Sequence, residues 1–266
     1  MCGRYVSSRR ADELGPLFGA VVDPEAAARE PEWNVAPTDP VPAVLERRRR
    51  GAGAPASTGG ERGAAEDAVE RRLVVARWGL VPSWARDLRG GARLINARLE
   101  SAPTTPAFRR AFAARRCLLP ADGWYEWTPG ERGGRQPWLL RPRDGGVLAF
   151  AGLYELWWPR EGGGSDGPAA PVLSVTVLTT EAVDEAGRVH DRMPVGVEPE
   201  GWDAWLDPAT TAPEAVLPLL APAALGRVEA VAVSPEVNNV RARGPGLVRP
   251  LPPADAPDLD AQARLS

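Results

Sequence analysis

The feature that most restricts the fold of this chain is a series of short apolar segments, each ended by glycine, proline or a polar loop. Segments of this kind are typical of β-strands. They cover residues 41–45, 73–80, 116–127, 137–141, 147–158, 172–178 and 227–233. Helical patterns are few and do not alternate strictly with the strands; they cover residues 10–19, 104–115, 199–206 and 213–221. This pattern predicts a single α+β domain with a curved, largely antiparallel sheet and short flanking helices.

Two polar segments and a tail interrupt this pattern. Residues 47–72 contain an arginine run, a stretch rich in Gly and Ala, and mixed charges with almost no large apolar side chain, so we expect a disordered insertion. An arginine-rich arm that binds nucleic acid is the alternative for this segment. Residues 159–171 are expected to form a second polar loop, and residues 250–266 a Pro-rich flexible tail. The domain itself is then expected to span residues 1–249.

Composition excludes several classes of protein. The net charge is −3, so any binding site for a polyanion has to be a local arginine cluster. No apolar run is long enough for a membrane span, and the first residues lack the apolar core of a signal peptide, which favours the cytoplasm and no membrane partner. Cys2 and Cys117 are the only cysteines, so we expect no disulfide framework, no metal site and no cofactor; Cys117, in an apolar segment, is expected to be a core thiol.

The start of the chain carries unusual chemistry. If Met1 is trimmed, Cys2 becomes the first residue and carries both a thiol and an α-amine. An α-amine has a pKa of about 7.7–8.0, against about 10.4 for lysine, so near neutral pH much more of it is uncharged and able to attack a carbonyl. All 32 basic residues are arginine, so this α-amine is the only primary amine of the chain. Schiff-base chemistry is therefore expected at Cys2, although N-termini are commonly inert.

Two further residues could move protons. Glu126 follows Trp124 with strand spacing, so both side chains share one face; the glutamate is then either a surface charge or a desolvated acid with a raised pKa. His190 is the only histidine of the chain. It is either an ordinary surface or core residue or an acid/base group that titrates near pH 7.

Six blocks occur together in an order that resembles the SRAP family, the SOS response-associated peptidase domain of abasic-site processing proteins. They are MCGRY at 1–5, WNVAPT at 33–38, WGLVPSW at 78–84, INAR at 95–98, CLLPADGWYEW at 117–127 and HDRMP at 190–194. The resemblance spans residues 2 to about 249. Departures are the sequence Leu99-Glu100-Ser101, where the family more often has threonine after the glutamate, and the 47–72 insertion.

The resemblance implies a monomer that binds single-stranded DNA at an abasic site and cross-links to it through Cys2. The implied product is a thiazolidine, formed by lyase-like Schiff-base chemistry, and the protein would be cytoplasmic and associated with the nucleoid when bound to DNA. Asn96 would orient the amine or the sugar, and Glu126 and His190 would act as acid/base groups. Residues implied to bind DNA are Arg4, Asn34, Pro37, Trp78, Trp84 and Arg98.

Two other functions stay open. One is an N-terminal-nucleophile peptidase or amidase in which the α-amine of Cys2 serves as the base. The other is a non-catalytic single-strand binder that uses arginine and tryptophan side chains and has no need of Cys2.

Overall fold

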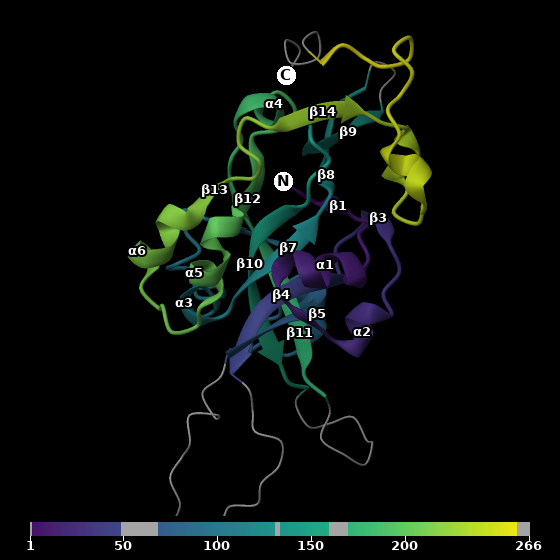
Figure 1. The fold of residues 1–266 in the computed structure, drawn as a ribbon. Helices are drawn as coiled ribbons and strands as arrows, with labels where there is room; N and C mark the ends of the chain where they lie inside the picture. Colours follow the sequence, from purple (N-terminus) through teal and green to yellow (C-terminus); the bar gives the residue numbers. More distant parts are fainter. Residues whose placement is uncertain (1, 49–68, 131–133, 160–169, 260–266) are drawn as a thin grey trace, which may run out of the picture.

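The computed structural model of this chain describes residues 2–48, 69–130, 134–159 and 170–259. Its strands form two sheets with short helices on their flanks (Figure 1). The five-stranded sheet has the order β14 (Val228–Ala232), β9 (Arg135–Pro142), β8 (Gly123–Pro129), β1 (Arg4–Ser7) and β3 (Glu32–Val35). The nine-stranded sheet has the order β13 (Leu220–Pro222), β12 (Arg192–Val197), β10 (Leu148–Trp157), β7 (Arg116–Ala121), β4 (Pro40–Arg48), β5 (Val69–Trp78), β11 (Val172–Glu181) and β6 (Asn96–Arg98), and β2 (Val21–Val22) pairs with β5.

The helices are short and lie outside the sheets. The α-helices are α1 (Ala11–Phe18), α2 (Pro24–Ala27), α3 (Arg109–Ala114), α4 (Asp184–Gly187), α5 (Trp202–Leu206) and α6 (Pro213–Val216). Turns of 3₁₀-helix are η1 (Leu88–Arg93), η2 (Pro199–Gly201), η3 (Leu217–Leu219), η4 (Pro235–Asn238) and η5 (Pro245–Val248). In Figure 1, α3, α5 and α6 lie together on one side of the nine-stranded sheet, and α1 and α2 lie near the strands at its centre. The prediction of an α+β fold with short flanking helices is confirmed.

The larger sheet closes on itself. Strand β10 pairs with β7 along one edge and with β11 along the other, while β7, β4, β5 and β11 are joined in sequence. The pairings of β11 with β5 and β6 are parallel, as is that of β2 with β5, and the other pairings are antiparallel. Closure of this kind requires the strong curvature that the sequence predicted.

Aromatic side chains fill the space where the two sheets meet. Tyr5 on β1 and Trp124 on β8 are cross-strand partners, and both are fully buried. The Tyr5 ring packs edge-on against Trp78 at 5.1 Å and against Phe150 at 6.1 Å, and Trp124 packs edge-on against Phe150 at 6.1 Å. Edge-to-face packing at these distances is favourable for aromatic rings. This cluster fixes the position of β1, and with it the start of the chain, against the larger sheet.

The predicted insertion at residues 47–72 is too long at both ends. Strand β4 continues to Arg48 and β5 begins at Val69, with Glu46 opposite Arg71 in the register. Arg71 donates a 2.7 Å hydrogen bond to Glu46, and Arg72 pairs with Asp23. These charged residues show no apolar alternation. Backbone hydrogen bonds between β4 and β5, together with the ion pairs, hold them in the strands. Residues 49–68 lie outside the described part of the chain, as do residues 160–169 of the expected polar loop.

The prediction of a flexible tail is wrong for residues 250–259. Pro250 forms a β-bridge with Val233, and the Leu251 amide donates a 2.9 Å hydrogen bond to the Ala232 carbonyl. Leu259 is buried in a cluster with Trp138, Val189 and Ala232. Its two leucines give the tail apolar surface to bury, and its prolines reduce the chain entropy lost on docking. Residues 260–266 lie outside the described part.

Candidate active site

Cys2 lies two residues before the first residue of β1, where the two sheets meet, and its side chain is buried. Strand β1 pairs with β8 so that Arg4 lies opposite Tyr125. Continuing this antiparallel register brings the first residues of the chain beside Glu126. The Cys2 thiol lies 3.8 Å from the Arg4 carbonyl, its weak hydrogen-bond acceptor. Cys2, the residue with the most distinctive chemistry in the sequence, is therefore held in the interior.

Asn96 holds Cys2 from the other sheet. Its Nδ2 donates a 2.7 Å hydrogen bond to the Cys2 carbonyl. Asn96 is the first residue of β6, which pairs in parallel with β11 opposite Val177. The Asn96 Oδ1 atom is also buried, and no residue in the described ranges donates a hydrogen bond to it. The amide thus fixes the first described residue and keeps one acceptor available beside it.

Glu126 is a desolvated acid, one of the two alternatives that the sequence left open. Its side chain lies on the Trp124 face of β8 and only 3% of the residue is exposed. Burial raises the pKa of Glu126 to about 7. Burial, together with the nearby charge of Glu126, also raises the pKa of the Cys2 thiol well above its ordinary value. The thiol is therefore neutral at physiological pH, and its neighbour is a carboxyl group able to exchange protons there.

His190 lies between α4 and β12, with its ring about half buried. Its Nδ1 atom is 3.0 Å from the Arg192 amide and 2.7 Å from Oδ1 of Asp191. Burial lowers the pKa of His190, which favours the neutral ring. In the neutral ring Nδ1 accepts the Arg192 N–H bond and the proton sits on Nε2; in the protonated ring Nδ1–H donates to Asp191. His190 can therefore change its proton content without losing its anchorage.

A groove of about 560 Å³ joins these groups. Its lining residues come from the chain start, the loop after β3, β8, the start of β9, the loop before β12, and η4 with the loop after it. They are Gly3, Arg4, Pro37, Glu126, Trp127, Arg135, His190, Asn238 and Val240. Glu126 and His190 thus face one cavity, and Cys2 lies directly beside it because the next residue, Gly3, is part of the wall. Of the predicted DNA-binding residues, Arg4 and Pro37 line this groove.

Arg4 is anchored inside the protein as well as facing the groove. Its Nη1 donates to the Val237 carbonyl at 2.6 Å and to Oδ1 of Asn34 at 3.0 Å, and its Nη2 donates to the Asn238 carbonyl at 3.2 Å. The guanidinium also lies 5.4 Å from the centre of the Trp127 ring. These contacts hold its positive charge at a fixed place on the wall, with part of its donor capacity left for a ligand.

Asn34 and Trp78 cannot touch a DNA strand, so these two predictions are corrected. Asn34 is fully buried, and its amide donates towards the carbonyls of Val237, Asn239 and Ala242. It therefore holds the loop that forms one groove wall. Trp78 is also fully buried, packs against Tyr5, and donates from Nε1 to the Ile95 carbonyl at 2.9 Å. Its place in the core leaves no face for a base.

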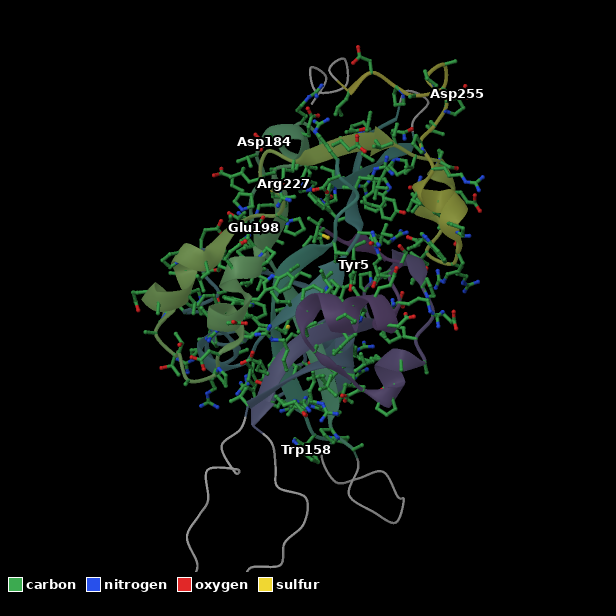
Figure 2. All side chains as sticks on the ribbon, viewed as in Figure 1. Tyr5, Trp158, Asp184, Glu198, Arg227 and Asp255 are labelled. Atoms are coloured by element: carbon green, nitrogen blue, oxygen red, sulfur yellow. The ribbon has the colours of Figure 1, made fainter. Side chains whose placement is uncertain are left out.

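Trp84 is exposed but lies away from Cys2. The neighbouring Ala85 carbonyl accepts a 2.9 Å hydrogen bond from Trp157. Trp157 pairs with Val172 at the start of β11, whereas Asn96 pairs with Val177 further along it. Figure 2 shows the adjacent Trp158 at the lower end of the molecule and Tyr5 near its centre. Arg98, in contrast, is exposed on β6 two residues after Asn96.

Five groove residues carried no assignment from the sequence, namely Gly3, Val240 and three with aromatic or polar side chains, Trp127, Arg135 and Asn238. Trp127 is part of the aromatic alternation after Trp124, so the sequence contained a signal for it. Arg135 and Asn238 gave no signal, because one follows a Gly-rich turn and the other lies in a polar segment. Within the described ranges, no group of three or more His, Cys, Asp or Glu side chains could hold a metal ion, and no helix is long and apolar enough to cross a membrane.

The fold and these side chains define an α+β protein with a cysteine-centred site at the start of the chain. Residues 1–240 match the family described as SOS response associated peptidase (SRAP). The chain belongs to this family, as the six sequence blocks predicted.

Several proteins of known name are similar to it along most of their length. Abasic site processing protein YoaM of Bacillus subtilis is 32% identical over 239 residues, covering 90% of this chain and 93% of that protein. Abasic site processing protein YoqW of the same organism is 31% identical over 248 residues, covering 93% and 99%. Abasic site processing protein HMCES of Gallus gallus is 27% identical over 284 residues, covering 94% and 78%.

Solved structures show the same fold. A crystal structure of a protein from Bacteroides thetaiotaomicron superposes with a TM-score of 0.71 at 19% identity, covering 94% of this chain and all of the other. A second, from Bordetella bronchiseptica, has a TM-score of 0.62 at 24% identity and covers 88% of this chain. At these identities the likeness concerns the fold alone.

Proposed function

We propose that this protein processes abasic sites in single-stranded DNA by forming a thiazolidine cross-link through Cys2 after Met1 is removed. The relatives named as abasic site processing proteins support the substrate. The observation that carries the proposal is the hydrogen bond from Asn96 to the Cys2 carbonyl, which holds the thiol-bearing residue beside Glu126. The functional unit proposed is one domain at residues 1–249, acting as a monomer in the cytoplasm and on the nucleoid when bound to DNA.

The reaction has two steps. The open form of an abasic site is an aldehyde; the uncharged α-amine of Cys2 adds to its carbonyl carbon, and loss of water leaves an imine. The Cys2 sulfur then attacks the imine carbon, forming a C–S bond, while the S–H proton is transferred to the imine nitrogen. The product is a five-membered thiazolidine, and one water is released overall. Because both nucleophiles belong to one residue, the second step is intramolecular, with effective molarities that can reach the order of 10⁵ M.

Glu126 fits the proton transfer of the second step. A neutral thiol must lose its proton as sulfur attacks, and a carboxylate with a pKa of about 7 can accept that proton and pass it to nitrogen. The raised pKa of the Cys2 thiol makes this assistance necessary, since little thiolate forms without it.

His190 and Asn96 fit the earlier steps. The neutral His190 ring carries its proton on Nε2 and can donate it to the sugar oxygen during ring opening or to the hydroxyl that leaves as water. Asn96 keeps the Cys2 backbone in place, and its Oδ1 can accept an N–H bond from the attacking amine. Together they provide an acid and an amide that orients the nucleophile.

Arginine side chains near the site fit the DNA backbone. Arg4 lines the groove and Arg98 is exposed beside Asn96, so both can approach phosphates next to the lesion. Pro37 offers an apolar surface on the same wall. Trp84 is left out of this interface because it lies near the start of β11, away from Val177, the residue that pairs with Asn96.

The structure gives less support to the alternatives. A thiol peptidase needs a thiolate, and burial with a nearby carboxylate disfavours the thiolate of Cys2. A non-catalytic strand binder does not require a buried cysteine bracketed by Asn96 and Glu126.

The variant Cys2→Ser tests the proposal, because it keeps the α-amine and permits methionine removal but replaces sulfur with a weak hydroxyl nucleophile. Wild type should form a heat-stable adduct with abasic single-stranded DNA without a reductant, visible in intact-mass measurements as protein lacking Met1 plus DNA minus one water. Cys2→Ser should stall at an imine that is trapped only by borohydride. An equally stable adduct from Cys2→Ser without borohydride shows that sulfur is not in the bond; peptide cleavage by a wild type that forms no adduct favours the peptidase.

A further inference from the structure

A second groove of about 550 Å³ adjoins the groove lined by Glu126 and His190, which we call the reaction groove. Three parts of the chain line it: the β8–β9 connection, η4 and the docked tail. The lining residues are Gly130, Gly134, Arg135, Gln136, Pro235, Asn238, Ala254, Asp255, Ala256 and Pro257. We call this cavity the tail groove. Its volume is within the range of small-ligand sites, and about equal to that of the reaction groove.

Arg135 and Asn238 line both grooves. Asn238 is held from two sides, since its Nδ2 donates to the Arg135 carbonyl at 3.1 Å and its Oδ1 accepts from Nε1 of Trp127 at 2.6 Å. These bonds make a fixed ridge between the two cavities. A ligand too long for the reaction groove meets the tail groove directly across that ridge.

The ridge carries the positive charge of Arg135, which also acts on Glu126 and His190 in the neighbouring groove. The Arg135 side chain is exposed, and none of the ion pairs within 4 Å between described residues includes it. Its guanidinium lies 5.6 Å from the centre of the Trp127 ring, on which Arg4 also packs at 5.4 Å. Cation–π contacts orient such a side chain without cancelling its charge. Arg135 is therefore ready to bind an anionic group that crosses from one groove to the other.

The docked tail forms the far wall of the tail groove. Residues 254–257 lie beyond residues 1–240, the part of the chain that matches the family. The hydrogen bond from Leu251 to Ala232 and the burial of Leu259 fix this segment at both ends. Figure 2 shows Asp255 at the upper edge of the molecule, beyond β9 and β14. The Asp255 carboxylate makes the tail wall unfavourable for phosphate, so an anionic ligand is bound from the Arg135 wall.

We infer that the DNA strand leaves the reaction groove over Arg135 and that the next nucleotide on one side of the lesion lies in the tail groove, its phosphate on Arg135. This inference rests on the proposed function and adds a subsite to it. A phosphodiester supplies the anion that the ridge requires, and a nucleotide is a ligand of the size that the tail groove accepts. The tail thereby extends the footprint of the protein on DNA beyond the abasic residue.

Gly134 allows a charge test of this subsite. It lines the tail groove next to Arg135, a Cβ atom added there meets nothing within 4 Å, and its φ lies outside the left-handed region. Gly134→Glu and Gly134→Arg therefore introduce long side chains of opposite charge with little strain. Gly134→Gln is the neutral control of the same shape as glutamate. If the new side chains only block the groove, all three variants should weaken DNA binding. If a phosphate is bound there, Gly134→Glu should weaken binding and Gly134→Arg should strengthen it.

The experiment compares a minimal abasic oligonucleotide, with one phosphate on each side of the lesion, with oligonucleotides extended on the 5′ or the 3′ side. Wild type should bind one of the extended forms more tightly. Arg135→Ala and Gly134→Glu should weaken that form about five- to tenfold, Gly134→Arg should strengthen it, and Arg135→Ala should lower the salt slope by about 0.7. Arg110→Ala, an exposed arginine on α3, should change neither.

Cross-linking to the minimal oligonucleotide separates this inference from the proposed function. A wild type that cross-links the minimal form but gains nothing from extension on either side overturns the tail-groove subsite and leaves the function standing. Equal weakening by Gly134→Glu, Gly134→Gln and Gly134→Arg overturns the phosphate assignment. A wild type that binds the extended forms yet never cross-links overturns the proposed chemistry instead.

Discussion

The side-chain amide of Asn96 donates a 2.7 Å hydrogen bond to the backbone carbonyl of Cys2, 94 positions earlier in the chain. The bond joins segments of different sheets, since Cys2 precedes β1 of the five-stranded sheet and Asn96 begins β6 of the nine-stranded sheet. One bond therefore connects the start of the chain to the larger sheet at the place where Glu126 lies. It turns a chain terminus, which is ordinarily frayed, into a fixed part of the site.

Asn96→Asp should slow cross-linking by about 10²-fold, because it replaces the donor to Cys2 with a carboxylate that repels the carbonyl and misplaces the nucleophile. Asn96→Ala removes the same donor without adding a charge and should fall between wild type and Asn96→Asp. Adduct formation under single-turnover conditions gives the rates, and a binding assay with intact single-stranded DNA is the control. Parallel losses of rate and of binding contradict a positioning role.

Glu126→Gln should slow cross-linking by about 10²–10⁴-fold and move the increase in rate from about pH 7 to the higher pKa of the α-amine, about 7.7–8.0, because the carboxylate is the proton acceptor. Binding of intact DNA should change little. A variant whose pH–rate profile still rises near pH 7 shows that another group titrates there.

The same substitution has a predicted effect on stability. Burial raises the pKa of Glu126 from 4.5 to about 7, so the folded state holds this proton more tightly than the unfolded state. The resulting stabilisation is complete below about pH 4.5 and is lost as pH rises towards 7, by at most about 3 kcal/mol. Urea unfolding should find Glu126→Gln similar to wild type at pH 4 and more stable than wild type at pH 8.5. A less stable variant at pH 8.5 contradicts the assignment of the raised pKa.

Trp78→Phe should lower the free energy of unfolding by about 1–3 kcal/mol and leave DNA binding unchanged. The variant removes one of the two donors to the Ile95 carbonyl, which keeps its 3.0 Å hydrogen bond from the Val177 amide, and it opens space beside Tyr5. Trp127→Phe, in the groove, is the comparison and should affect DNA binding more than stability. Denaturant unfolding and binding to single-stranded DNA separate the two, and weaker DNA binding by stable Trp78→Phe restores the base-stacking role.

Replacing residues 49–68 with Asn-Gly should preserve folding and cross-linking. Arg48 and Val69 are paired in the antiparallel register, and Asn-Gly is a favoured two-residue connection for such a pair. Loop-closure entropy grows only with the logarithm of loop length, so this shortening should raise the unfolding free energy by about 2 kcal/mol apart from turn effects. The salt dependence of DNA binding is the second measurement, and a reduced slope supports the arginine arm.

Leu259→Asp should slow cross-linking to the minimal abasic oligonucleotide more than it weakens binding. Leu259 packs with Val189, which precedes His190, and with Trp138, the cross-strand partner of Glu126. A buried charge at this position should release the tail and loosen both supports. Leu225→Asp makes the same change at an exposed position and is the control. An unchanged rate for Leu259→Asp, with the tail shown to be detached by proteolysis, removes the tail from the support of the site.

Local patterns in the sequence were sufficient to predict the strands of the core and the chemistry available at Cys2. Apolar runs ended by turn residues predicted most of β4, β5, β7–β11 and β14, because strands buried in the core, such as β7 and β10, are apolar along most of their length. Strand β12 was missed, since its Pro194 and Gly196 interrupt the run and its partners β10, β11 and β13 are supplied by the fold. The six ordered blocks were sufficient to predict the family.

Only the tertiary structure decided which of these residues face a cavity. Trp78 and Trp84 belong to one motif, yet the first is in the core and the second is on the surface, because β5 ends between them and the chain turns away. Asn34 is similarly a polar residue in a recognised block, and its side-chain amide group donates to backbone carbonyls more than 200 positions away. Burial, the raised pKa of Glu126 and the shared ridge at Arg135 all depend on pairing between segments that are far apart in the sequence. Local patterns along the chain do not specify which of these segments pair.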